Sequence, residues 1–208
     1  MKGSLLIVSF FLLGALLGWY DLLPDRVIKS DIAIYILYVL MLLVGLSVGS
    51  DKRLIEVIKG MHPRLLLIPM ATIIGTLIAS AVISLFLSRW SLFECMAVGS
   101  GFAYYSLSSI LITELKSPSL GAQVAAELGT IALVANLFRE IMTLLFAPLF
   151  VKYFGRLAPI SAGGATTMDT TLPIITKYSG KDLVFVSILH GIIVDFTVPF
   201  FVSFFCSL

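Results

Sequence analysis

Long apolar runs separated by short polar links dominate the chain. Residues 4–20 are apolar behind Lys2, and residues 32–49 form a second run without a charged side chain. A third run covers residues 65–88, and the last covers residues 182–206. Because about twenty apolar residues in a helix match the hydrocarbon thickness of a bilayer, each run predicts a membrane-spanning helix.

The polar links predict the orientation of these spans. Residues 50–64 hold the densest basic cluster of the chain, Lys52, Arg53, Lys59 and Arg64. Basic loops favour the cytoplasmic side, which places the N terminus there as well. A cleaved signal peptide is the alternative for residues 4–20, but the usual small-residue cleavage pattern is missing after Leu17, which favours a retained span.

Two further stretches break an apolar pattern with polar residues. Residues 99–109 contain glycines, serines and two tyrosines, and residues 163–178 contain Gly-Gly, threonines, Asp169 and Pro173. Irregular backbone is tolerated at bilayer depth only where protein or a water-filled cavity satisfies it, so both stretches are predicted to be broken or re-entrant segments that line a cavity. The alternatives are a serine-rich packing face for the first and an extramembrane loop with an N-capping Asp for the second.

A long apolar segment, residues 117–151, lies between these breaks. Ser117 and Pro118 resemble an N-cap and a first helical residue at its start. At 1.5 Å per residue, roughly thirty residues exceed the hydrocarbon layer, so the segment must tilt, kink or divide. In the span predicted at residues 65–88, the small residues Gly75 and Ala79 are four apart, a spacing that predicts close packing against another helix.

The long segment carries three ionisable side chains, Glu127, Arg139 and Glu140. Helical spacing puts Asn136, Glu140 and Thr143 on one face, whereas Arg139 points elsewhere. Ionisable residues at bilayer depth generally face a bundle interior or a wet cavity, which favours a functional path. The alternative is a structural network in which Arg139 pairs with a carboxylate on another helix.

Two other polar residues are assigned structural roles. Ser91 and Glu94 match a capping box at the start of the fourth apolar segment. His190 in the last span is interpreted as a hydrogen-bonded interior histidine, and Asp195 lies five residues further on, on a different helix face. A His-Asp relay within this helix is therefore not expected, although Asp195 is a candidate to face the same cavity.

Composition agrees with a membrane protein. Of the 208 residues 59% are hydrophobic and 12% charged, against about half and a quarter in soluble domains. We predict one all-α transmembrane domain over residues 1–208, with about six transmembrane helices plus the two broken segments. The net charge of +2 is scattered, which gives no indication of nucleic-acid binding. No catalytic, metal-binding or phosphate-binding motif is present, so neither an enzyme nor a cofactor is expected.

Four motifs in order resemble the lysine exporter LysO family. They are SGFAYYSLSSILITE (100–114), ELGTIALVANLFRE (127–140), GGATTMDTTLP (163–173) and LHGIIVDFTVP (189–199). The resemblance implies export of L-lysine and of toxic lysine analogues, with two essential intramembrane acidic residues that correspond to Glu140 and Asp169. Family members commonly carry a further hydrophobic block before the part present here, a difference that suggests a split transporter whose missing block a partner chain supplies.

The chemistry of lysine fits these residues. Its two ammonium groups call for two anions, Glu140 and Asp169, and its carboxylate calls for an anion-binding nest at the amides around Gly163 and Gly164. Further candidates to line the site are Tyr104, Tyr105, Ser106, Ser108, Asn136, Thr166, Thr167, Thr170 and Thr171, and candidate supporting charges are Glu127, Arg139 and Asp195. Because a proton and an ammonium group compete for the same carboxylate oxygens, exchange of lysine for protons is expected.

The sequence thus predicts a multi-pass transporter of the plasma (inner) membrane that exports L-lysine in exchange for protons. The alternative is a non-transporting subunit or half-transporter that needs a second hydrophobic subunit or forms a homo-oligomer. An intramembrane aspartyl protease using Asp169 and Asp195 is a remote third interpretation, because neither residue lies in a GxGD pattern.

Overall fold

The computed structural model describes residues 63–208 continuously and only isolated positions before them. The predicted spans at 4–20 and 32–49, the basic loop and the predicted cytoplasmic N terminus therefore lie outside the described residues.

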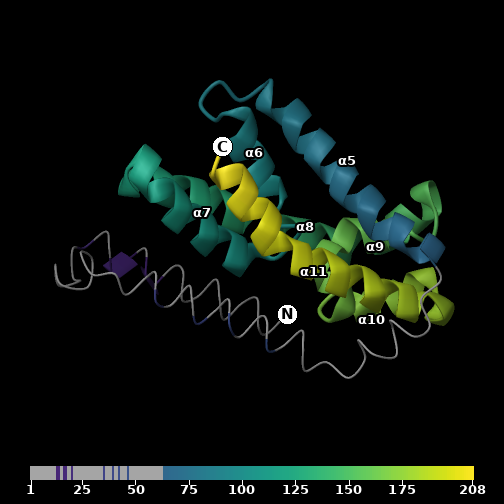
Figure 1. Ribbon diagram of the computed structural model, residues 1–208. Helices are drawn as coiled ribbons and strands as arrows, with labels where there is room; N and C mark the ends of the chain where they lie inside the picture. The colour runs from purple at the N-terminus through teal and green to yellow at the C-terminus, as the bar shows by residue number, and fades with distance from the viewer. Residues whose placement is uncertain are drawn as a thin grey trace. The chain divides into compact units, whose positions relative to one another are not determined.

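Every regular element in this part of the chain is helical, as predicted, and the elements follow one another as Figure 1 shows. They are η1 (Pro63–Leu66), α5 (Leu67–Ser84), α6 (Leu92–Gly99), α7 (Tyr105–Leu120), α8 (Ala122–Phe154), α9 (Ala158–Gly163), η2 (Gly164–Met168), α10 (Leu172–Ser179), η3 (Lys181–Leu183) and α11 (Val184–Cys206).

Three stretches of helix are long and apolar enough to cross a membrane: Leu67–Ser84, Ala122–Phe154 and Lys181–Cys206. Their mean hydropathies are 2.0, 1.6 and 2.0. They correspond to the predicted third span, the long segment and the last span. The total of about six spans for the whole chain stays a prediction.

The ends of α6 and α8 test the predicted helix boundaries. The capping box of α6 is confirmed, because the Ser91 amide donates to the Glu94 carboxylate and the Glu94 amide donates to the Ser91 hydroxyl. The predicted start of α8 at Ser117 is wrong: Pro118 lies in the last turns of α7, and the chain turns at Gly121, whose φ is +82°. Glycine adopts this conformation without strain, so it sets the boundary instead of the Ser-Pro pair.

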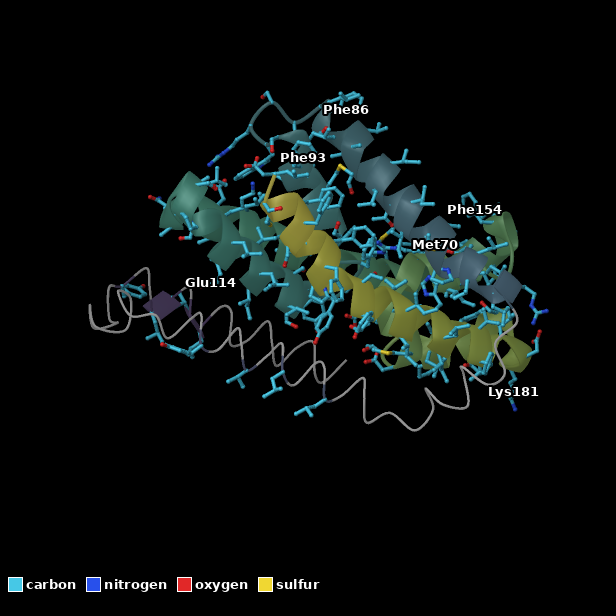
Figure 2. The ribbon with its side chains drawn as sticks, in the orientation of Figure 1. Met70, Phe86, Phe93, Glu114, Phe154 and Lys181 are labelled. Carbon is cyan, nitrogen blue, oxygen red and sulfur yellow. The ribbon has the colours of Figure 1, made fainter. Side chains whose placement is uncertain are left out.

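The distribution of side chains is that of a protein in an apolar solvent. Large hydrophobic side chains point outward, as Phe86 (81% exposed) and Phe154 (76% exposed) do at the periphery of Figure 2. The fully buried residues include polar ones, among them His190, Thr143 and Thr167. Polar groups thus gather where protein partners can satisfy them.

Close packing between α5 and α6 occurs at a different place from the one predicted. A Cβ on Gly75 would meet nothing within 4 Å, and Ala79 is exposed. The close approach lies at Gly99 of α6, where a Cβ would sit 2.0 Å from the Ser80 hydroxyl oxygen. No described helix makes the close contact predicted at Gly75 and Ala79, and the glycine that admits α5 is on α6.

Both predicted breaks are present and they touch, but they are shorter than predicted, because residues 105–109 belong to α7 and residues 172–178 to α10. We call residues 100–104, between α6 and α7, the first break, and residues 163–171, from the last residue of α9 to the start of α10, the second break. The Ala165 amide in the second break donates to the Phe102 carbonyl in the first, at 2.8 Å. Phe102 and Ala103 have φ of 43° and 75°, and Gly164 has φ of 58°. We call this contact between the two breaks the crossing.

Gly164 permits the crossing, because a Cβ on it would lie 2.2 Å from the Phe102 carbonyl oxygen. Gly164→Ala is expected to lower stability by about 2 kcal/mol or more, through this clash and the positive φ. Gly75→Ala is the matched control, since it has open space and should be neutral or stabilise α5 by up to about 1 kcal/mol. Thermal unfolding in detergent measures both, and equal midpoints for the two variants would contradict this account of the crossing.

Candidate functional site

Asn136 of α8 holds the first break. Its side-chain oxygen accepts the Ala103 amide at 2.9 Å, and its side-chain nitrogen donates to the carbonyls of Val98 at 3.0 Å and Ala132 at 2.9 Å. Asn136 is 3% exposed. The break thus frees backbone groups that no helix satisfies, and a side chain of the long neighbouring helix satisfies them.

Threonine hydroxyls hold the second break. Thr166 donates to the Gly163 carbonyl at 2.8 Å and lies 3.3 Å from the Thr171 hydroxyl. The Thr167 hydroxyl lies 2.9 Å from the carbonyl oxygens of Gly164 and Ser187. These contacts use the hydroxyls within the fold, and the first amide after Gly164 is already bound at the crossing. Of the threonines expected to line a ligand site, Thr170 alone is partly exposed and has only its amide engaged, by the Asp169 carboxylate.

Arg139 binds the C-terminal end of α9. Its guanidinium donates to the carbonyls of Ser161 at 2.9 Å and Ala162 at 2.8 Å, and to the Thr76 hydroxyl at 3.3 Å. It also lies 6.0 Å from the ring centroid of Phe102. A cation is favourable at a helix C terminus, where the last carbonyls lack intrahelical partners. Arg139 therefore uses carbonyl partners in place of the carboxylate that the alternative interpretation required.

Glu140 lies on α8 between the two breaks. It is 2% exposed, and it shares the buried face with Asn136 and Thr143, which confirms the predicted face. Asn136, one turn before Glu140, binds the first break. Thr143, about one turn after it, faces the second, since a Cβ on Gly163 would lie 3.4 Å from the Thr143 methyl carbon. Glu140 thus lies about one helical turn from the residues of α8 that contact each break.

Asp169 lies in the second break, directly after η2, and is exposed. It is close enough to Asp195 of α11 and to Tyr104 of the first break for its charge to act on both. Asp195 is buried, at 5% exposed. The structure therefore brings together a carboxylate from the second break, a carboxylate from the last span and a phenol from the first break.

His190 has the structural role predicted for it. It is fully buried, its Nδ1 lies 3.1 Å from the Thr167 hydroxyl, and its Nε2 lies 3.0 Å from the Thr72 hydroxyl. The histidine thereby ties α11 to both the second break and α5. The roles of Thr72 and Thr76 of α5 could not be predicted from the sequence, because single threonines in an apolar run give no indication of a distant partner.

The remaining candidates divide by location. In the first turn of α7, Tyr105 (8% exposed) and Ser108 (0%) are buried, whereas Tyr104 and Ser106 are partly exposed. The Ser108 hydroxyl donates to the Tyr104 carbonyl at 2.9 Å. Glu127 lies apart from the crossing, where it forms an ion pair with Arg89 at 2.5 Å. Tyr104 is thus the member of the tyrosine pair that is near Asp169.

Apolar helices around two crossing breaks, with carboxylates beside them, define a multi-pass membrane protein with the discontinuous helices that many transporters use to build a substrate site. Residues 8–206 match the family described as Lysine exporter LysO, and the chain belongs to that family. No solved structure matches.

The chain matches two relatives, and the share of each relative that the match covers differs. Lysine exporter LysO of Escherichia coli (strain K12) is 30% identical over 173 residues, which cover 83% of this chain and 54% of that protein. A putative lysine exporter of Haemophilus influenzae (strain ATCC 51907 / DSM 11121 / KW20 / Rd) is 30% identical over 205 residues, which cover 97% of each chain. The chain thus spans about half the length of the first relative and nearly all of the second.

Arg139→Lys tests the contact between α8 and α9. Lysine keeps the charge but cannot reproduce the planar fork that reaches two carbonyls and a hydroxyl, so we expect stability to fall by about 2 to 4 kcal/mol. Arg89→Lys makes the same change in an exposed ion pair and should change stability by less than about 1 kcal/mol. Thermal unfolding of the two variants in detergent compares them, and a larger loss from Arg89→Lys would refute the role given to Arg139.

Proposed function

We propose that this protein exports L-lysine, and toxic analogues of lysine, across the inner membrane by alternating access at the crossing. Membership of the lysine exporter family carries the proposal, and we assign transport to the crossing. Both broken segments meet there, with Asp169 in the second break and Glu140 beside the breaks on α8.

The substrate chemistry supports this location. Lysine brings two ammonium groups into the protein, and carboxylates at bilayer depth are costly unless they bind a cation or a proton. Asp169 is exposed and lies on irregular backbone, so it can meet an entering ammonium group. Glu140 is buried on the rigid α8, about one turn from the residues that contact each break, where a small rearrangement of the breaks would change its surroundings.

Exchange for protons follows from the same groups. A carboxylate that has bound an ammonium group cannot also hold a proton at the same oxygens. If lysine leaves on the outer side and protons replace it, the reset of the transporter carries protons inward. Lysine export would thereby draw on the proton gradient.

A half-transporter that needs a partner subunit is the second candidate. The chain covers 54% of the Escherichia coli relative and 97% of the Haemophilus influenzae relative. Reconstitution of the purified chain without any partner separates a half-transporter from a chain that needs no partner. A protease is not proposed, although Asp169 and Asp195 approach each other, because the family is one of exporters.

Glu140→Gln and Asp169→Asn test the two acidic residues. Each substitution keeps the shape of the side chain and removes its charge, so we expect lysine efflux from loaded cells to fall at least tenfold while the protein stays in the membrane. Asp182→Asn, in an exposed ion pair with Arg156, is the control and should keep wild-type efflux. Wild-type efflux in either test variant would remove that residue from the mechanism.

Proton exchange is tested in proteoliposomes that hold a pH-sensitive dye and L-lysine. As lysine leaves through the wild-type protein, protons should enter and the lumen should become more acidic. Replacing internal lysine with L-norleucine, which lacks the side-chain ammonium group, should abolish the acidification. Lysine efflux without any change in internal pH would refute proton exchange and leave the export proposal in place.

A further inference from the structure

Asp195 is a carboxylate on α11 that the protein encloses almost completely. It is 5% exposed, and no described residue donates a hydrogen bond to it, yet its oxygens keep some accessible surface, because Ser179 Oγ is the one fully buried side-chain atom without a partner among the described residues. Other buried polar side chains of this region have partners, as His190 has two threonines and Asn136 has three backbone groups. Burying a carboxylate without a partner is costly, and such residues are retained where a ligand or proton serves as the partner.

Asp195 lies on α11 at the level of the crossing. One turn before it, Gly191 touches the second break, since a Cβ there would lie 2.6 Å from the Met168 amide nitrogen. Beyond it, the Phe201 ring packs edge-on against Phe102 of the first break, with centroids 6.2 Å apart. Asp195 lies between these two contacts along the helix.

The neighbours of Asp195 come from both breaks. Asp169 follows Met168 directly and lies close enough to Asp195 for the two carboxylates to interact electrostatically. Tyr104, two residues after Phe102, interacts electrostatically with both carboxylates. Arg139, the nearby cation on α8, is bound to the carbonyls of α9 and to Thr76. The two carboxylates thus lie near each other, and the described salt bridges put no cation on either of them.

We propose that Asp195, Asp169 and Tyr104 form the subsite that binds one ammonium group of the substrate. This inference rests on the proposed export of lysine and adds Asp195 to the residues that contact lysine. An ammonium group has three donors and no acceptor, and two carboxylates with a phenol oxygen supply three acceptors from three separate elements. Its positive charge also relieves the repulsion between the carboxylates, and the Tyr104 ring can add a cation–π contact.

The arrangement suits an ammonium group better than a metal ion. Metal sites for hard cations usually need several oxygen or nitrogen ligands at once. Among residues 63–208, no group of three or more His, Cys, Asp or Glu side chains is placed to hold a metal ion. A site made of two carboxylates and one phenol is therefore assigned to an organic cation.

Asp195→Asn is the test, measured by counterflow of labelled L-lysine into proteoliposomes containing the full chain. Counterflow needs no proton gradient, so it is independent of the coupling ion. We expect the lysine concentration for half-maximal counterflow to rise at least tenfold, or exchange to be lost. Asp182→Asn, the same substitution near the start of α11, should behave as the wild type does.

Thermal unfolding distinguishes binding from a structural role. Because Asn removes a largely buried charge that accepts no hydrogen bond from the described residues, the unfolding midpoint of Asp195→Asn in detergent should equal or exceed that of the wild type. A lowered midpoint together with lost exchange would assign Asp195 a structural role and overturn the inference. Asp195→Glu keeps the charge and should retain part of the exchange that Asp195→Asn loses.

The remaining outcomes separate the two proposals. If the lysine concentration for half-maximal counterflow in Asp195→Asn lies within threefold of the wild-type value, the ammonium subsite is overturned and the proposal of lysine export is unaffected. A wild-type protein that exchanges no lysine would overturn the export proposal, and the subsite with it.

Discussion

The need to satisfy backbone polar groups away from water governs this structure. Two helices are interrupted inside an apolar protein, and each interruption leaves amides and carbonyls that lipid cannot satisfy. One backbone hydrogen bond, from the Ala165 amide to the Phe102 carbonyl, joins the two interruptions. The absence of a side chain at Gly164 permits that bond, because any Cβ there would collide with the Phe102 carbonyl.

The long helix α8 supports this crossing through residues within two turns of one another. Asn136 binds the first break, Arg139 binds the end of α9, and Thr143 faces Gly163 in the second break. Glu140 lies among these supports, on the buried face. A charged residue placed there is surrounded by the groups that hold both breaks, so a change in its charge acts on the part of the fold where helices are interrupted.

Local features of this structure could be predicted from the sequence, and long-range ones could not. Gly-Ser-Gly and Gly-Gly identified both breaks, and helical spacing identified the face that carries Asn136 and Glu140. The start of α8 was missed because Pro118 and Gly121 are both boundary residues, and only backbone conformation decides between them. The use of the Thr167 hydroxyl and the proximity of Asp195 to Asp169 depend on how α11 packs on the second break, and spacing in one segment carries no information about that packing.

The polar residues of the crossing fall into two physical groups. Asn136, Thr167 and His190 have their partners within the fold, so they stabilise it and have little capacity left for a ligand. Asp195 is 5% exposed and accepts no hydrogen bond from the described residues, and Asp169 is exposed near it, so both keep acceptor capacity. The near-complete burial of the Asp195 carboxylate carries a cost that no hydrogen bond from the described residues offsets. The cost is understandable if a cation from outside the protein supplies the missing partner during part of a transport cycle.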